Sequence, residues 1–251
     1  MNKTQKPVRY LLPLLQADFI ILLRNRRAVL VSVMLPLVLL FASANQRSQS
    51  AQAGPSIMVV LAVTIGLLSL AIIGYASAVA RDRERGVFQR LRVTPAPTWT
   101  IMVSRLLVQL LVGLTVAIAV LTIGARMDHI SVSGSEYVNT MLVATLESAL
   151  FLAVGQALVG LVKSAAMVNS LGSLLFVALA LSGLWSIGGP LGSGFQEFAK
   201  WTPVGTVVTI FQSALHQVAW NLATTLSLIA CFGYIVLFLL IGIKWFKWEA
   251  R

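Results

Sequence analysis

The sequence predicts an all-α integral membrane protein with six transmembrane helices. Its 251 residues are 58% hydrophobic and only 11% charged, and the mean hydropathy is +0.88. A soluble domain carries about 25% charged residues, so this chain has too few charges to coat a water-facing surface. A disordered chain has the opposite composition. Transmembrane β-strands alternate apolar and polar residues, whereas the apolar runs here are continuous.

Six apolar runs approach or exceed the roughly 20 residues that a helix needs to cross about 30 Å of hydrocarbon. The first run is the shortest and contains Pro36, which neighbouring helices can accommodate. It ends in a motif that resembles a signal-peptidase site, but the leader before it is too long for that pattern. We therefore expect one transmembrane domain over residues 1–251, with spans at about 28–44, 57–80, 100–124, 139–162, 168–187 and 222–243.

The positive charges predict the orientation of these spans. The chain has 19 Lys and Arg against 8 Asp and Glu. Of the 19, 16 fall on the side that carries both termini, and only Arg47, Arg126 and Lys200 fall on the other. Cytoplasmic loops are enriched in Lys and Arg, so both termini are expected in the cytoplasm. Because topology accounts for the charge, no nucleic-acid partner is expected.

The first cytoplasmic segment outside the spans is residues 8–25. After Pro13, its apolar residues follow helical spacing, with Asp18 as the exception. We expect an interfacial helix that lies along the inner membrane face and contacts lipid. The alternative is a basic leader that only orients the chain.

The second cytoplasmic segment is residues 81–93, RDRERGVFQRLRV. On a helix, Val87, Phe88 and Leu91 form an apolar stripe, and Glu84 lies on the same side one turn earlier. Pro95 then disfavours helix at the residue before it. The pattern indicates a short amphipathic helix that faces a partner or the protein's own cytoplasmic helices. The plainer interpretation is an ordinary basic loop.

The outer segment at 188–221 is too polar to span and too apolar for a soluble domain. We expect one short helix over 195–201 and a second that begins at Pro203. Semi-apolar short helices between spans typically re-enter the outer leaflet or cap the protein there. Trp201 and Trp220 suit anchoring at the membrane interface.

A few residues inside the spans are candidates for a role beyond packing. A charge at mid-membrane costs roughly 2.5–3.5 kcal/mol, so Glu147 is expected to face protein or water. It is either a pathway or gating residue or a hydrogen-bonded strut between helices. Tyr75 and Phe176 are further pathway candidates, with lipid or packing contact as the alternative. Small residues that permit close helix approach, in an internal or a subunit contact, are Ala149, Ala153, Ala157, Gly160 and Ser164.

The chain lacks the sequence signatures of an enzyme. It has no phosphate-binding loop and no H-E-x-x-H motif, and no G-x-S-x-G motif. With one cysteine and two histidines, it has no metal-ligand spacing. We therefore predict no catalytic residue, metal or cofactor in this chain. Energy for uphill transport is expected to come from another chain.

The stretch ARDRERGVFQRLRVTP over residues 80–95 resembles the membrane subunit, or permease, of ABC-2 type ABC exporters, in the drug- and antibiotic-efflux branch. In that family, the second span ends in a Glu-Arg-x-Gly stretch followed by Leu-Arg-x-Thr-Pro, whereas in this chain Gly86 follows Arg85 directly. The first span and the region around the fifth are similar in composition. The matching residues are Glu84, Arg85, Gly86, Leu91, Arg92, Thr94 and Pro95.

The resemblance implies that residues 81–93 form a cytoplasmic coupling helix, which docks on a separate ATP-binding cassette subunit carrying ATP and Mg. The expected docking residues are Glu84, Arg85, Val87, Phe88, Leu91 and Arg92.

The resemblance also implies a bacterial inner-membrane exporter that works as a homodimer, or as a heterodimer with a sister permease. The predicted function is outward movement of a hydrophobic or amphipathic small molecule. The alternatives are export of a lipid or lipid-linked glycan, and a non-transporting membrane scaffold or sensor. An intramembrane enzyme is disfavoured because no catalytic dyad is present.

Overall fold

The computed structural model describes residues 8–24, 34–41, 55–92, 98–127, 132–188, 192–215 and 218–245, and it contains only helices in these ranges. Five helices are long and apolar enough to cross a membrane: Ile57–Glu84, Thr100–Met127, Gly134–Leu161, Ala165–Ile187 and Leu222–Trp245. They coincide with the second to sixth predicted spans. Of the first predicted span, 28–44, only residues 34–41 are described, and they are helical. The remainder of that span lies outside the described residues.

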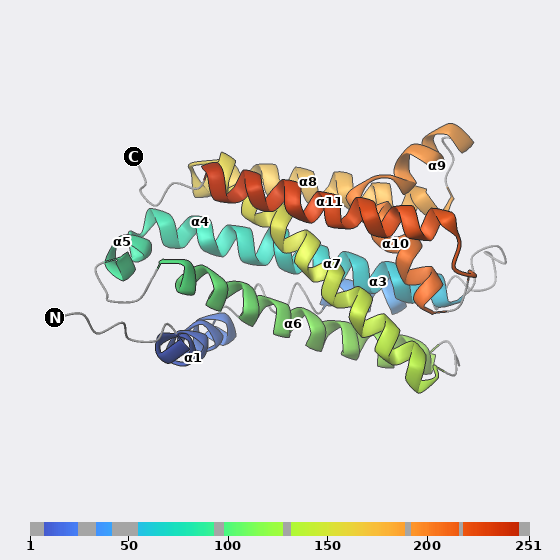
Figure 1. The fold of residues 1–251 in the computed structure, drawn as a ribbon, viewed down its shortest axis with the longest axis horizontal. Helices are drawn as coiled ribbons and strands as arrows, with labels where there is room; N and C mark the ends of the chain where they lie inside the picture. The colour runs from blue at the N-terminus through green and yellow to red at the C-terminus, as the bar shows by residue number, and fades with distance from the viewer. Residues whose placement is uncertain are drawn as a thin grey trace.

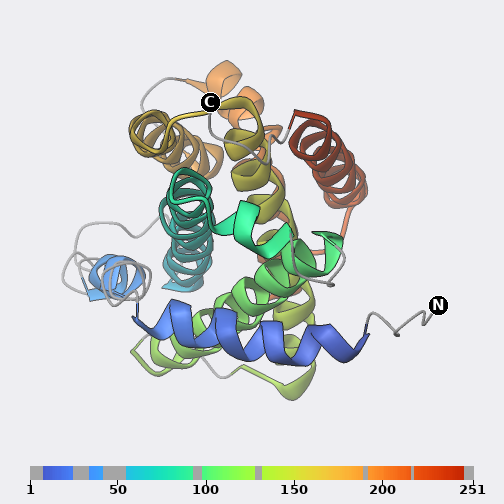
Figure 2. The same ribbon diagram turned by 90° about the vertical axis from the view of Figure 1, so that its left-hand side faces the viewer.

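The long helices lie side by side, and the short helices collect at the two ends of the bundle (Figure 1). Helices α1 and α5 lie at one end, here called the α1–α5 end, and α9 lies at the opposite end. Figure 2, viewed from the α1–α5 end, shows α1 lying across the spans rather than along them. The bounds are α1 Val8–Arg24, α5 Val87–Arg92 and α9 Ser193–Lys200.

The second span lies at the centre of the bundle. It is one continuous helix built from α3 (Pro55–Ser69), a π-helical segment η1 (Leu70–Ala76) and α4 (Ser77–Glu84). Its most apolar stretch is 83% buried, against 17% in each of α8 (Ala165–Ile187) and α11 (Leu222–Trp245). Within the described chain, the second span therefore forms the core, and α8 and α11 form the periphery.

Helices α6 (Thr98–Met127) and α7 (Gly134–Leu161) complete the core around the second span. The start of α7 is fixed by a capping box, in which the Ser133 hydroxyl accepts from the Glu136 N–H and the Glu136 carboxylate accepts from the Ser133 N–H. This reciprocal pairing satisfies two backbone donors that would otherwise be unpaired at a helix start.

Small residues let α7 and α11 pack closely. A Cβ placed on Gly160 would lie 3.0 Å from the carbonyl oxygen of Gly242, and one on Gly242 would lie 3.2 Å from the amide nitrogen of Ala157. The sequence left open whether Ala157 and Gly160 serve an internal or a subunit contact. Within the described chain, both serve an internal contact.

The segment at 188–221 forms the two predicted short helices. Helix α9 covers most of the predicted 195–201 helix, and α10 (Pro203–Ala214) begins at Pro203 as expected. The Thr202 hydroxyl accepts from the Gly205 N–H and caps α10, and proline is favoured at this first helical position. Val207, Ile210 and Phe211 of α10 are buried, so this side of the helix packs into the bundle.

Candidate functional site

The end of α4 is attached to the end of α7 by the buried side chain of Arg83. Its Nη1 donates to the Val159 carbonyl at 2.8 Å, and its Nη2 donates to the Val162 and Lys163 carbonyls at 2.6 and 2.7 Å. The last carbonyls of a helix have no partner within the helix and form the negative end of its dipole. A guanidinium supplies both N–H donors for these carbonyls and a positive charge for the dipole. Arg83 therefore acts as a C-terminal cap that another helix supplies.

The neighbouring residue, Glu84, attaches α4 to the start of α8. Its Oε1 accepts from the Ala165 N–H at 2.6 Å. Ala165 is the first residue of α8, where backbone donors are unpaired and a negative charge is favoured. Two consecutive side chains of opposite charge therefore hold opposite helix ends, and together they fix the α7–α8 corner to the end of the second span.

A second polar cluster, here called the Arg105 hub, joins α6 to α4 and α1. The Arg105 Nη1 lies 2.7 Å from Asp82 Oδ2, and its Nε lies 3.7 Å from Asp18 Oδ1. The Ser104 hydroxyl donates to Asp18 Oδ2 at 2.6 Å. Burial raises the pKa of Asp18 above its ordinary value of 3.8, while the Ser104 hydrogen bond and the Arg105 charge oppose that rise.

Helix α5 is attached to the same hub through an aromatic ring. The Arg105 guanidinium carbon lies 4.8 Å from the centroid of the Phe88 ring, which is within cation–π range. Phe88 is only 1% exposed. The sequence left open whether the apolar stripe with Phe88 faces a partner or the protein's own helices, and the ring packs inside the protein. Glu84 likewise uses its carboxylate within the chain, although its side chain remains largely exposed.

The other predicted docking residues lie nearer the surface. Arg85 is exposed in the turn between α4 and α5, and Val87 is half-buried. Leu91 and Arg92 belong to α5, but their side chains lie outside the described ones. On α5, Gln89 and Arg90, which were not among the predicted docking residues, are exposed, so the exposed side chains described there are polar and one of them is cationic.

The predicted continuous helix over residues 81–93 is corrected by the structure. Residues 81–84 end the second span, and α5 begins at Val87 after a turn at Arg85 and Gly86. Gly86 has φ +67°, a left-handed conformation that glycine adopts without steric cost. The turn directs α5 away from the axis of α4.

Sequence reasoning gave no site role to Asp82, Arg83 or Arg105. A signal was present for Arg83, since it lies four residues after the apolar Val79 and therefore on the same buried helical face. A signal was also present for Asp18, an acid on the apolar face of α1. Such an acid requires a buried partner, and that partner is Arg105.

The interior candidates Tyr75, Glu147 and Phe176 lie on three different elements. Tyr75 is in η1, and its hydroxyl donates to Gln156 Oε1 of α7 at 2.7 Å. Phe176 is half-buried on α8, at the edge of the core. No hydrogen bond between any two of the three occurs in the described part of the chain.

Glu147 of α7 is fully buried, with 0% of its surface exposed. Neither carboxylate oxygen has a hydrogen-bond partner among the described residues, and the same holds for the hydroxyls of Thr64 and Ser148. These three polar side chains come from the central helices of the bundle. Whether Glu147 is a pathway residue or a strut between helices stays a prediction.

Substitution of Glu147 tests the cost of this buried acid. Glu147→Gln is expected to unfold at the same temperature as the native protein or a higher one, because an amide of equal size avoids the cost of a mid-membrane charge. Glu147→Lys is expected to lose most of the folded protein. The measurement is thermal unfolding in detergent, and a large loss of stability in Glu147→Gln would contradict the expectation.

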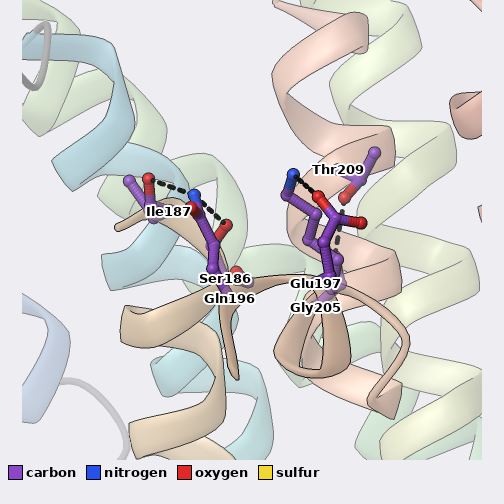
Figure 3. Close-up of polar contacts among 7 residues, drawn as sticks. Ser186, Ile187, Gln196, Glu197, Gly205 and Thr209 are labelled. Carbon is purple, nitrogen blue, oxygen red and sulfur yellow. Dashed lines mark hydrogen bonds and ion pairs between the residues drawn. The ribbon is translucent and has the colours of Figure 1, made fainter. Parts of the chain in front are cut away.

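The opposite end of the bundle is held by contacts between α9 and the spans. Gln196 donates from Nε2 to the Ile187 carbonyl at 3.2 Å, which satisfies the end of α8 (Figure 3). The Trp185 and Phe195 rings meet edge to face at 4.9 Å. The Tyr234 hydroxyl of α11 donates to the carbonyl of Trp201, just after α9, at 2.6 Å. These contacts fix α9 over the ends of α8 and α11.

Comparison with known proteins identifies the architecture. Residues 28–244 match the model of the family described as "ABC-2 family transporter protein". A search among individual curated proteins finds no match.

Among the residues that the structure describes, no three His, Cys, Asp or Glu side chains gather in an arrangement that could hold a metal ion.

Proposed function

The chain belongs to the ABC-2 family of transporter proteins, and on that premise we propose that it exports a hydrophobic or amphipathic small molecule from the cytoplasm or inner leaflet. It is the multi-pass membrane subunit of an ABC transporter, a family that normally works with a separate ATP-binding subunit. In the proposed exporter, that subunit carries ATP and Mg, and it docks at the α1–α5 end of this chain.

The observation that carries this proposal is the attachment of α4 and α5 to the rest of the bundle. Arg83 and Glu84 hold the ends of α7 and α8, and Phe88 packs on Arg105 of α6. A force applied to α5 therefore reaches four long helices through side-chain contacts. This is the arrangement that a transporter requires if a subunit outside the membrane is to move the spans.

The proposed docking surface is the exposed side of the α4–α5 turn and α5. Its described cationic members are Arg85 and Arg90, and the sequence resemblance adds Leu91 and Arg92. Phe88 supports this surface from within, and the exposed Glu84 lies beside it and holds the start of α8. A cleft with an acidic rim on the ATP-binding subunit would complement it, since charge complementarity steers and orients association.

The orientation and assembly follow from the same proposal. The α1–α5 end faces the cytoplasm of a bacterium, because the Lys and Arg residues concentrate on that side. Two permeases, either identical or a pair of sister chains, enclose the pathway. Glu147, Tyr75 and Phe176 are the proposed pathway or gating residues. An interior that is largely apolar favours a hydrophobic or amphipathic substrate over a strongly polar one.

The proposed function is tested by purifying the tagged chain from native membranes in mild detergent and measuring ATPase activity. We expect an ATP-binding subunit in stoichiometric amount. Arg85→Glu with Arg90→Glu is expected to lower its recovery about tenfold, equivalent to ~1.4 kcal/mol. Arg126→Glu is the matched control, because Arg126 is exposed at the end of α6 remote from α5. Phe88→Asp is less informative, because it places a charge in the core.

Recovery of the chain alone, without ATPase activity, would contradict the exporter and favour a scaffold or sensor. Equal recovery of the ATP-binding subunit with the double variant and with the Arg126→Glu control would contradict the proposed docking surface. Transport of lipid-linked glycan by the reconstituted complex, with no movement of small amphipathic molecules, would replace the proposed substrate.

A further inference from the structure

We propose that Arg105 is the positioning residue of the transporter: it fixes the docking helix α5 to α6 and to the interfacial helix α1, so that the three helices move as one unit. The inference rests on the proposed function, in which an ATP-binding subunit moves α5. It adds α1, which lies across the spans (Figure 2), to the parts that respond to ATP.

The geometry of the hub supports a joint rather than a surface contact. Arg105 reaches Asp82 at 2.7 Å and Asp18 at 3.7 Å, and the side chains of these residues are 10%, 21% and 14% exposed. Screening by water and salt is weak for charges that are this well buried. Removal of one partner from a buried ion pair is strongly destabilising, because an uncompensated charge remains.

The contact with Phe88 explains why this position requires arginine. A guanidinium presents its planar face to an aromatic ring and directs its N–H donors at carboxylates in the same plane. Arg105 uses both properties, with the face over Phe88 and the edge toward Asp82. A lysine keeps the charge but cannot make both contacts at once. Arg105→Lys is therefore expected to transport an amount of substrate per ATP hydrolysed that lies between those of the native protein and Arg105→Gln.

The charge balance of the hub predicts that loss of Arg105 has a larger effect than loss of either carboxylate. One guanidinium serves two carboxylates, and Asp82 already acts to raise the pKa of Asp18. Without Arg105, the two carboxylates would repel each other and separate α1 from α4. Arg105→Gln is therefore expected to lower the substrate transported per ATP hydrolysed more than Asp18→Asn or Asp82→Asn alone. Adding Asp18→Asn to Arg105→Gln is expected to recover part of this transport, because it removes the repulsion.

The first experiment measures substrate transported per ATP hydrolysed in the reconstituted complex, with each variant compared at equal amounts of assembled complex. Arg105→Gln is expected to lower this ratio about tenfold while the ATP-binding subunit still co-purifies, since mutations in a coupling network act at this scale. Arg126→Gln serves as the control, because its residue is exposed at the far end of α6. If the complex fails to form in every variant and in the native protein, the proposed function has failed rather than the joint.

The second experiment measures the α1–α5 distance directly, so that a general loss of stability does not imitate the result. Spin labels at Gln16→Cys and Gln89→Cys report this distance, since both residues are exposed, and Cys231→Ala removes the chain's one cysteine. Because Gln89 lies on the proposed docking surface, the distance is measured only in labelled protein that still co-purifies with the ATP-binding subunit. We expect one narrow distance, unchanged by ATP, in the native background. In Arg105→Gln, a broadened or ATP-dependent distance is expected. An ATP-dependent distance in the native background, or an unchanged one in Arg105→Gln, would overturn the proposal.

Discussion

Arg83→Gln is expected to destabilise the protein more than any other single charge removal at the α1–α5 end. The side chain is 2% exposed, and it donates three hydrogen bonds to the carbonyls of Val159, Val162 and Lys163. Hydrogen bonds from a charged group contribute about 1.5–3 kcal/mol each, and a buried carbonyl left unpaired costs about 1–3 kcal/mol. Because such contributions are not additive, we expect a total loss of about 3 kcal/mol or more.

The measurement is thermal unfolding in detergent, where this loss corresponds to a fall of about 10 °C in the midpoint for a chain of this size. Arg81→Gln is the matched control, since Arg81 is on the same helix and is only half-buried. Arg83→Lys should fall between the two, because one ammonium cannot reach all three carbonyls. Equal midpoints for Arg83→Gln and Arg81→Gln would show that the α7 cap contributes nothing.

Gly242→Val is expected to disrupt the crossing of α7 and α11. A Cβ at this position would lie 2.8 Å from Gln156 Cγ and 3.1 Å from the Gln156 carbonyl carbon, so backbone as well as side chain must move. Overpacking of this kind typically costs about 1–3 kcal/mol. Displacement of Gln156 also affects its hydrogen bond with Tyr75, so the change reaches the π-helical segment at the centre of the bundle.

Gly233→Val is the control for this substitution. Gly233 is on the same helix, is exposed, and has nothing within 4 Å of an added Cβ. We expect Gly233→Val to unfold at the native temperature and to transport normally, whereas Gly242→Val loses both stability and transport. If both variants behave alike, the loss arises from valine in α11 in general, and the close crossing has no special role.

The spans were predictable from sequence because they depend on one local property, a continuous apolar run. The runs starting at residues 57, 100, 139, 168 and 222 all correspond to long helices. The helix start at Pro203 was predictable for the same kind of reason, since proline at the first helical position is a local signal. Gly86 carried a local signal too, but its surroundings follow helical spacing so well that the turn was missed.

The polar contacts at the α1–α5 end were not predictable, because each partner comes from a distant part of the chain. Asp18 and Arg105 approach each other across 87 positions, and Arg83 reaches carbonyls more than 75 residues away. Packing of Phe88 on the protein's own helices was one of two interpretations of its apolar stripe, and the sequence could not choose between them, since it does not show that the guanidinium of Arg105 covers the ring.

The π-helical segment at residues 70–76 has a consequence for how the second span is mapped. A π-helix pairs each residue with one five positions away, so the angular offset between successive side chains differs there from that of α3 and α4. The side chains on the two flanking stretches therefore belong to two helical phases, although the backbone is continuous. A residue-by-residue labelling scan of this span should show a periodicity that breaks between Leu70 and Ala76 and resumes with a rotated origin.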